Sequence, residues 1–236
     1  MKRDFLRGTL IFLTFSPIVM LLFFGCTKND PTTEITPDTT IEDVDGNSYH
    51  TVTIGTQTWL VENLKTTKYR NGDPIPNLQS DNQWATTSDG AYSDYANNPA
   101  LSTDRGKLYN WFAVNDARNI APAGYHVPNA EEWEELVQYL GGEAIAGGKL
   151  KEAGLGHWAD PNTGATNSSG FTALPTGFRS RDGSFSGLSG FGYYWSASEN
   201  YQQTSAWYFG MNMDWAGIEK AIEFEKTGHA VRCIKD

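Results

Sequence analysis

Cysteine is scarce in this chain, which has only Cys26 and Cys233 among its 236 residues. A cage of cysteine ligands around zinc needs several sulfur atoms, so two cysteines exclude a site of that kind. If Cys26 is chemically modified, as argued below, Cys233 has no partner for an internal disulfide. We therefore interpret Cys233, in the alternating run HAVRCIKD, as a small buried hydrophobic residue.

Basic residues are also few. The chain has 18 Lys and Arg against 28 Asp and Glu, which gives a formal net charge of -10. Residues 1–25 alone carry a net charge of +2, so the remainder carries -12. An acidic surface of this kind repels phosphate backbones, and we expect no binding of nucleic acid.

Motifs of known catalytic sites are missing as well. We find neither the G-x-S-x-G motif of a serine nucleophile nor the H-E-x-x-H motif of a zinc protease. The four histidines lie far apart in the sequence, and the glutamates of residues 131–135 belong to the start of one helix. We expect a protein that is not an enzyme and has no catalytic residues.

The N-terminal segment has the features of an export signal. Basic residues precede an apolar run from Leu10 to Phe24, which Pro17 interrupts and which ends in Gly25-Cys26. This run is short and broken for a membrane-spanning helix. Its end resembles the cleavage and lipidation site of bacterial lipoproteins. We predict a signal peptide over 1–25 and lipidation of Cys26, with an ordinary cleaved signal or an uncleaved anchor as alternatives.

Acyl chains on Cys26 would tether the protein to a membrane. The polar residues 28–30 resemble the surface-export signals of Bacteroidetes lipoproteins. We therefore expect the cell envelope, at the outer membrane, as the location. Residues 26–40 are rich in Thr, Pro and Asp, which predicts a flexible tether before a single domain over 41–236.

The domain shows signals of both strands and helices. Turn residues at 45–47 and at Gly55 predict three short strands at its start. Asn129 and Glu132 form a capping-box pattern before an apolar stripe from Trp133 to Leu140, which predicts a helix. A second, weaker helix is expected in EAIAGGKLKEAG. Residues 65–105 are expected to form a loop layer, and residues 108–114 either a helix or a strand. Strand-like runs then return near the C-terminus. The class is α+β, with antiparallel sheets, one or two helices and a long irregular loop region.

Eight sequence blocks, in this order, resemble the Fibrobacter succinogenes major paralogous domain: TVTIGTQTWLVENLKT, LYNWFAV, PAGYHVPNAEEWEEL, LGGEAIAGGKLKE, GFTALPTGFRSRDGSF, GYYWSASE, AWYF and VRCIKD. Shorter pieces are similar to members of the C-type lectin-like superfamily. HVPNAEEWE resembles the formylglycine-generating enzymes, and YYWSASE with VRCIKD resembles the lectin-like domain of Legionella collagen-like proteins. The resemblance implies a C-type lectin-like fold, with both ends of the domain in one sheet and long loops opposite.

Two departures from these relatives limit what can be carried over. The formylglycine-generating enzymes use a pair of cysteines, whereas the domain here has only Cys233, so their activity is not expected. Members of the paralogous family commonly have a cysteine where this chain has Ala121, and that cysteine could pair with the one in the last strand. The resemblance therefore implies either that a disulfide has been lost or that the family cysteines never pair.

Aromatic and basic side chains in the glycine-rich region are the predicted ligand contacts. Rings on loops suit stacking against sugars or protein surfaces, and arginines add hydrogen-bond donors. The predicted residues are Trp158, Phe178, Arg179, Arg181, Phe185, Tyr193 and Tyr194. The alternative is that most of these rings fill a secondary core beneath the loops.

We expect no cofactor, and a bound calcium ion is the alternative. Asp160, Asn162 and Asn167 carry oxygen atoms in the loop ADPNTGATNSSG, but the sequence signatures of the lectin calcium site are missing. We expect a non-catalytic, lipid-anchored envelope protein that binds a glycan or a protein. A structural or assembly component of the envelope is the alternative, and an unrecognised enzyme the third possibility.

Overall fold

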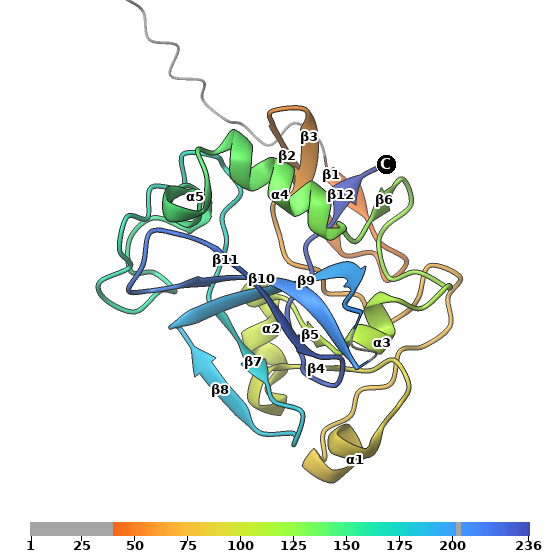
Figure 1. Cartoon of the computed structure of the whole chain (residues 1–236). Coiled ribbons are helices and arrows are strands. Elements are labelled where there is room, and N and C mark those ends of the chain that lie inside the picture. Colours follow the sequence, from red (N-terminus) through yellow and green to blue (C-terminus); the bar gives the residue numbers. More distant parts are fainter. Residues whose placement is uncertain (1–39, 202–203) are drawn as a thin grey trace, which may run out of the picture. The chain divides into compact units, whose positions relative to one another are not determined.

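The computed structural model describes residues 40–201 and 204–236 (Figure 1). The predicted signal peptide, the lipidation site Cys26 and all of the predicted tether except Thr40 lie outside the described residues. Thr40 is the first residue of strand β1.

The first sheet joins the start and the end of the domain. Its strand order is β1-β2-β3-β12-β6, and all of its pairs are antiparallel. The strands are β1 (Thr40–Glu42), β2 (Ser48–Ile54), β3 (Gln57–Leu60), β6 (Tyr125–His126) and β12 (Ile234–Lys235). The predicted three-strand meander is confirmed, with Gly55 at φ 63° in the second turn. Thr51 and Val52 point to opposite faces of β2, yet both are buried. The face of Thr51 is covered because it also carries Tyr49, which belongs to the second hydrophobic cluster.

The second sheet has the order β11-β10-β9-β7-β8. Its strands are β7 (Thr176–Arg179), β8 (Phe185–Leu188), β9 (Phe191–Glu199), β10 (Ser205–Asn212) and β11 (Glu219–Phe224). β7 and β9 pair in parallel, which differs from the expected antiparallel arrangement. The reason is that β8 folds back on one edge of β7, and β9 then reverses again and occupies the other edge. A further pair, β4 (Tyr92–Ser93) with β5 (Leu108–Tyr109), is antiparallel.

Helix α4 (Ala130–Tyr139) packs between the two sheets (Figure 1). The predicted capping box is confirmed: Asn129 Oδ1 accepts from Glu132 N at 2.9 Å, and Glu132 Oε2 accepts from Asn129 N at 2.8 Å. The apolar stripe is buried as expected. It contacts Val52 and Trp59 of the first sheet and Phe209 of the second within one hydrophobic cluster.

His126 lies at the start of α4, between two carboxylates. Its Nε2 is 2.9 Å from Glu132 Oε1, and its Nδ1 is 2.8 Å from Asp236 Oδ1. Burial lowers the pKa of His126, but the hydrogen bonds to the two carboxylates outweigh this and raise the pKa above its ordinary value. The side chain therefore joins the helix to the C-terminal strand.

The predicted weaker helix is confirmed as α5 (Glu143–Leu150). Its two glycines lower helix propensity, and the packing explains why they are there. A Cβ atom on Gly147 would lie 1.8 Å from the carbonyl oxygen of Gly217, and one on Gly148 would lie 2.3 Å from that of Gly164. Only glycine permits this close approach of the neighbouring loops.

The segment 65–105 has more regular structure than the predicted loop layer. It contains α1 (Asp81–Thr86), the 3-10 helix η1 (Tyr95–Asn97), α2 (Pro99–Arg105) and the short strand β4. The run 108–114, for which helix and strand were both open, is divided between β5 and α3 (Trp111–Val114). Asn110 caps α3 through its side chain, so the polar residue inside the apolar run marks the change.

Cys233 and Ala121 both lie in the second hydrophobic cluster, beside Tyr49 and Trp195. Cys233 is a free, fully buried thiol, which confirms the interpretation as a small hydrophobic residue. Burial raises the pKa of its thiol to about 12, so the reactive thiolate is not formed at neutral pH.

Buried cations fix the long loops to the sheets. The ammonium of Lys151 donates to the carbonyl oxygens of Thr163, Asn212 and Trp215 at 2.9 to 3.0 Å, and burial lowers the pKa of Lys151 to about 8. Arg232 similarly ties the loop at Phe171 to the end of β3. Carbonyl oxygens that loops would otherwise leave unpaired are thereby satisfied.

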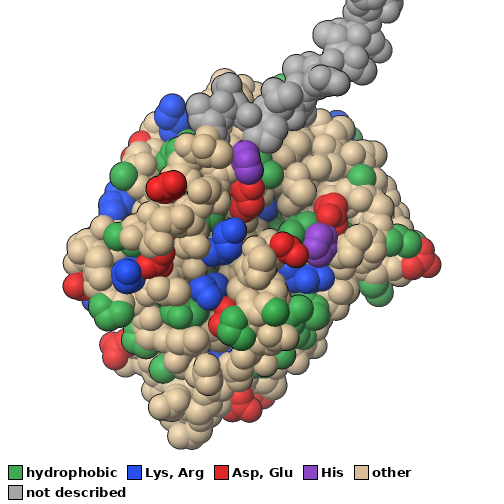
Figure 2. Space-filling model, turned by 180° about the vertical axis from the view of Figure 1, so that it is seen from behind, with side chains coloured by type: hydrophobic (Ala, Val, Ile, Leu, Met, Phe, Trp, Pro, Cys, Tyr) green, Lys and Arg blue, Asp and Glu red, His purple; other side chains and the backbone are tan. Residues whose placement is uncertain are grey.

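The described residues are thus α+β, as predicted, whereas the lectin-like fold remains a prediction. Among these residues, no helix combines the length and the apolar character needed to cross a membrane. Figure 2 shows acidic and basic side chains interspersed over the back of the molecule, with hydrophobic side chains in small, separate patches. This face therefore offers no broad apolar surface.

Candidate functional site

Two of the predicted ligand-contacting rings lie in the interior. Trp158 and Tyr194 are 1% and 0% exposed and belong to the cluster around α4. Trp158 Nε1 donates to the carbonyl of Ala173 at 2.9 Å, and the Tyr194 hydroxyl donates to that of Leu174 at 3.1 Å. Both rings therefore support the loops from below, as the alternative interpretation held, and neither is presented to a ligand.

Arg179 is fully buried as well, and Phe185 packs against it. The guanidinium lies between the rings of Trp84, at 4.5 Å, and Phe185, at 4.7 Å. Its donors reach the carbonyl oxygens of Gly183 and Leu78. Arg179 thus holds the β7–β8 hairpin against the segment of α1, which is a structural role and corrects the predicted one.

Phe178 and Tyr193 are the two predicted residues that the fold brings together. Their ring centroids are 5.6 Å apart on one face of the second sheet, and Tyr193 also contacts Phe191 and Tyr208. Phe191 is exposed, whereas the other three rings are partly buried against their neighbours and the buried His229. The group forms a partly covered aromatic surface.

Two of the three calcium candidates, Asn162 and Asn167, form side-chain hydrogen bonds within the loop. Asn167 exchanges two hydrogen bonds with Thr172, and Asn162 Nδ2 donates to the carbonyl oxygens of Glu152 and Gly154. Within the described ranges, no group of three His, Cys, Asp or Glu side chains is arranged to hold a metal ion. Calcium binding by Asp160, Asn162 and Asn167 stays a prediction.

A surface pocket of about 460 Å³ lies where the segment 74–90 meets α3 and the chain that follows it. We call it the Arg118 pocket, and its lining residues are Pro74, Pro76, Ser88, Asp89, Gly90, Trp111, Phe112, Asn115, Asp116 and Arg118. The sequence predicted none of them as a ligand contact. The mostly polar residues 115–119, which follow the apolar helix α3, are the sequence feature that could have indicated this pocket.

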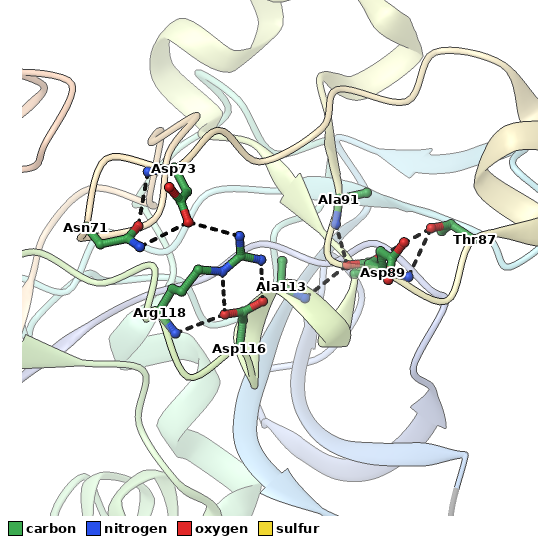
Figure 3. A network of polar contacts seen from close by, with 9 residues as sticks. Asn71, Asp73, Thr87, Asp89, Ala91, Ala113, Asp116 and Arg118 are labelled. Carbon is green, nitrogen blue, oxygen red and sulfur yellow. Dashed lines mark hydrogen bonds and ion pairs between the residues drawn. The ribbon is translucent and has the colours of Figure 1, made fainter.

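Arg118 is held in a fixed position by two carboxylates (Figure 3). Its Nε and Nη2 donate to Asp116 at 2.9 and 2.7 Å, and its Nη1 donates to Asp73 at 3.3 Å. The guanidinium stacks on the ring of Tyr69 at 3.9 Å. The hydrogen bond from Arg118 lowers the pKa of Asp116 to about 2, so this carboxylate stays ionised. The pair presents a planar, rigid set of polar atoms.

Asn110 fixes the opposite wall of the pocket. Its side-chain oxygen accepts from the backbone of Ala91 and Ala113, and its amide donates to the carbonyl of Asp89 at 2.9 Å. Asp89 N donates to Thr87 Oγ1, so the backbone around Asp89 is held from both sides (Figure 3). The Asp89 carboxylate is exposed and has no hydrogen-bond partner among residues 40–201 and 204–236.

Tyr69 lies beneath the Arg118 pocket. A Cβ atom on Gly90 would be 2.1 Å from the Tyr69 hydroxyl oxygen, so the absence of a side chain at Gly90 leaves space for this group. Tyr69 is fully buried, and its hydroxyl interacts with the carboxylate of Asp116. Burial, and then the charge of Asp116, raise the pKa of Tyr69 to about 12.

A second pocket, of about 500 Å³, shares Phe112 with the first. We call it the Arg181 pocket, and its lining residues are Ala85, Phe112, Arg181, Asp182, Thr204, Phe224, Glu225 and Lys226. Arg181, a predicted ligand contact, is exposed here and stacks on the ring of Phe224 at 4.2 Å. We refer to both pockets together as the Phe112 groove.

The Phe112 groove combines rings with planar polar groups. Carboxylate, amide and guanidinium groups form paired hydrogen bonds, and aromatic walls contribute apolar contact area. Concave sites with a few fixed polar groups are the usual form of small-ligand sites. Such a lining suits a molecule with many hydroxyl groups and apolar ring faces.

The described residues thus form an α+β domain built around two five-stranded sheets, with the Phe112 groove on its surface. The chain belongs to the Fibrobacter succinogenes major domain family, whose pattern matches residues 52–235. The match covers nearly all of the described part and confirms the family resemblance of the eight sequence blocks. No curated protein and no solved structure matches the chain significantly.

Proposed function

We propose that this protein is a lipid-anchored component of the cell envelope whose domain binds glycans in the Phe112 groove without catalysis. The observation that supports a glycan is the position of Phe112 between two pockets that both present fixed polar side chains. The pockets together have space for several sugar rings. A protein ligand and a role in envelope assembly are the competing outcomes of the tests below.

Replacing Phe112 by alanine is expected to weaken glycan binding about tenfold or more. Removal of a ring that a ligand covers loses roughly 1.5 to 3 kcal/mol of apolar burial, which corresponds to that change in the dissociation constant. The measurement is a glycan array with residues 40–236, followed by calorimetric titration of the sugars that bind.

Tyr139→Ala is the matched control for this variant. Tyr139 is 65% exposed at the end of α4 and lines a different pocket, with Gly55 and Gln138. Its removal should leave glycan affinity unchanged. If no glycan binds, and crosslinking in cells instead captures one partner in a fixed ratio, the assembly role replaces the proposal.

The envelope location depends on Cys26. With an alkyne-bearing fatty acid in the growth medium, the full chain should become labelled, and Cys26→Ala should lose the label. Cys233→Ala is the matched control, because Cys233 is buried in the folded domain and offers no site for acylation.

Detergent phase partition supplies an independent measurement. Acyl chains anchor a protein stably when more than one is present, so the wild-type chain should enter the detergent phase. An unlabelled wild-type chain that partitions into the aqueous phase would reject the lipid anchor and leave the glycan proposal intact.

A further inference from the structure

Strand β11 lies at one edge of the second sheet and pairs with β10 alone (Figure 1). Among the described residues it is the longest strand at a sheet edge, with six residues against four in β8, three in β1 and two in β6. An edge strand exposes backbone groups with which another chain can pair, and proteins usually keep such strands short or covered. β11 is therefore the edge that offers the most room for a further strand.

The outward backbone groups of β11 are free over two residues. Glu225 N donates to the carbonyl of Thr204 at 3.1 Å. Hydrogen-bonded positions alternate along an antiparallel pair, so the backbone groups of Lys220, Ile222 and Phe224 face away from β10. Those of Phe224 are already used, because its N–H donates to a neighbouring carboxylate and its carbonyl accepts from the next turn. The N–H and C=O groups of Lys220 and Ile222 have no partner within the described ranges.

One face of β11 has exposed apolar side chains. Ile222 and Phe224 are 42% and 43% exposed, and Ile222 lies opposite Trp207 of β10. Lys220 shares this face, but its ammonium bonds to Glu134 of α4 and lies 4.3 Å from the centre of the Trp207 ring. The charge of Lys220 is therefore engaged with α4 and β10 and does not guard the open edge.

The opposite face of β11 is acidic. Side chains alternate along a strand, so Glu219 and Glu223 lie on this face, with Ala221 between them. One Glu219 oxygen is 3.4 Å from the Tyr208 hydroxyl, and neither glutamate forms an ion pair with any of the described residues. Burial, and then the charges of these two glutamates, raise the pKa of Tyr193 to about 12. The edge thus carries two negative charges that no cation compensates.

A second copy of the chain does not complement these charges. If two copies of β11 paired in antiparallel fashion about Ile222, Glu219 of one copy would lie opposite Glu225 of the other. Like charges directly opposite each other destabilise a strand pair. The net charge of the chain is -10, so two copies also repel each other as a whole. A basic strand, in contrast, is attracted to this edge.

We propose that β11 binds an extended segment of a partner protein, which adds a strand to the second sheet and has alternating apolar and basic side chains. The free backbone groups of β11 pair with this segment. Its apolar side chains cover Ile222 and Phe224, and its basic side chains face Glu219 and Glu223. Arg181 already stacks on the Phe224 ring, so the basic side chains belong on the acidic face. This interaction is additional to the proposed glycan site and does not depend on it.

Calorimetric titration with two seven-residue peptides of identical composition tests the proposal. One peptide alternates lysine and valine, the other has its lysines in one block and its valines in a second, and both have blocked ends. The alternating peptide should bind the full chain in detergent about tenfold more tightly, because only its side chains separate onto two faces of a strand. Its affinity should fall as salt is raised. Hydrogen exchange, measured by mass spectrometry, should become slower at residues 219–224 when it binds.

Ile222→Lys should weaken binding of the alternating peptide about tenfold or more, because it removes an apolar contact and adds a like charge. Val44→Lys is the matched control, since Val44 is 45% exposed in the turn between β1 and β2 of the first sheet. The double variant Glu219→Gln and Glu223→Gln should lose most of the salt dependence while its apolar face is unchanged. Circular dichroism spectra of all variants check that the fold is retained.

The outcomes distinguish this proposal from its competitors. Equal affinity for the two peptides, or unchanged exchange at residues 219–224, overturns it, because the peptide then binds through charge alone or at another place. Sedimentation that shows wild-type dimers and Ile222→Lys monomers assigns the edge to a second copy and also overturns it. Ile222→Lys should leave glycan binding unchanged, so failure of the glycan proposal leaves this one in place, and the reverse holds as well.

Discussion

Replacing Arg232 by methionine is expected to lower the free energy of unfolding by about 3 to 5 kcal/mol, a large part of the stability of a typical domain. Arg232 is 1% exposed, and its guanidinium reaches two separate parts of the chain, residues 60–63 and 171–172. Nε and Nη2 donate to Asn63 Oδ1, and Nη1 donates to the carbonyl oxygens of Leu60 and Phe171 at 2.9 and 2.6 Å.

The large effect is expected because the hydrogen-bond acceptors of Arg232 would lose their donor. Methionine has a similar length but no donor, so a side-chain oxygen and backbone carbonyl oxygens would remain buried without partners. The guanidinium also lies 4.2 Å from the ring of Phe171, and this contact would be lost too.

Urea denaturation of wild type, Arg232→Met and Arg232→Lys measures the effect. Lysine keeps the charge but has one nitrogen atom, which cannot reproduce the forked contacts, so an intermediate loss is expected. A stability of Arg232→Met within 1 kcal/mol of wild type would show that the neighbouring carbonyl oxygens find other partners.

Acid should destabilise the domain through His229. The ring is 1% exposed and lies among Trp195, Tyr208, Tyr193 and Phe178, with centroid distances of 4.5 to 6.3 Å. Neither ring nitrogen has a hydrogen-bond partner among the described residues. Burial lowers the pKa of His229 to about 3, and the backbone of Gly228 offsets only part of this.

The direction of the effect follows from proton binding. Between pH 6.5 and 3 the unfolded chain holds a proton on His229 that the folded domain does not. The contribution of His229 is therefore fully present above pH 6.5 and falls by about 1.4 kcal/mol for each pH unit below it. At pH 3 the accumulated loss is on the order of 4 kcal/mol.

His229→Phe is expected to remove this pH dependence. At neutral pH the variant should be about 1 to 2 kcal/mol more stable, because two unpaired nitrogen atoms are replaced by carbon in an aromatic environment. The measurement is urea denaturation of both proteins between pH 4 and 8. Both proteins have the same carboxylates, so the pH dependence that these groups cause cancels from the difference in the free energy of unfolding. A constant difference over this range would contradict the prediction.

Buried hydrogen bonds also fix the position of the Phe112 groove. Trp111, next to Phe112, donates its indole N–H to the carbonyl of Ser196 in β9, and its backbone N–H to the carbonyl of Glu225. The short helix α3 is thereby fixed to the second sheet. Phe112 consequently has a defined position between the two pockets, which favours binding without a large cost in ordering.

The local elements could be predicted because the contacts that form them are close in sequence. The capping box joins Asn129 to Glu132, and the apolar stripe of α4 repeats every three to four residues. The turns near Gly46 and Gly55 separate strands that alternate in polarity. The eight sequence blocks likewise identified the family that the match over 52–235 shows.

The burial of the predicted ligand-contacting residues could not be read from the sequence, because burial depends on residues far away along the chain. Arg179 and Arg181 are only two positions apart in the same segment. Arg179 is nevertheless buried between Trp84 and Phe185, whereas Arg181 is exposed and stacks on the ring of Phe224. Trp158 stands in a run of polar and glycine residues and is nevertheless core.

Sequence alone therefore determined the α+β class, the positions of α4, α5 and the first turns, the family and the acidic balance of this protein. Each of these follows from composition or from interactions within a few residues. Only the tertiary structure decided which side chains form a site: the Phe112 groove takes its walls from residues 74–118 and from 181–226, and the two come together through the packing of α3 against β9. No local pattern records that contact, because its two sides are some 85 residues apart.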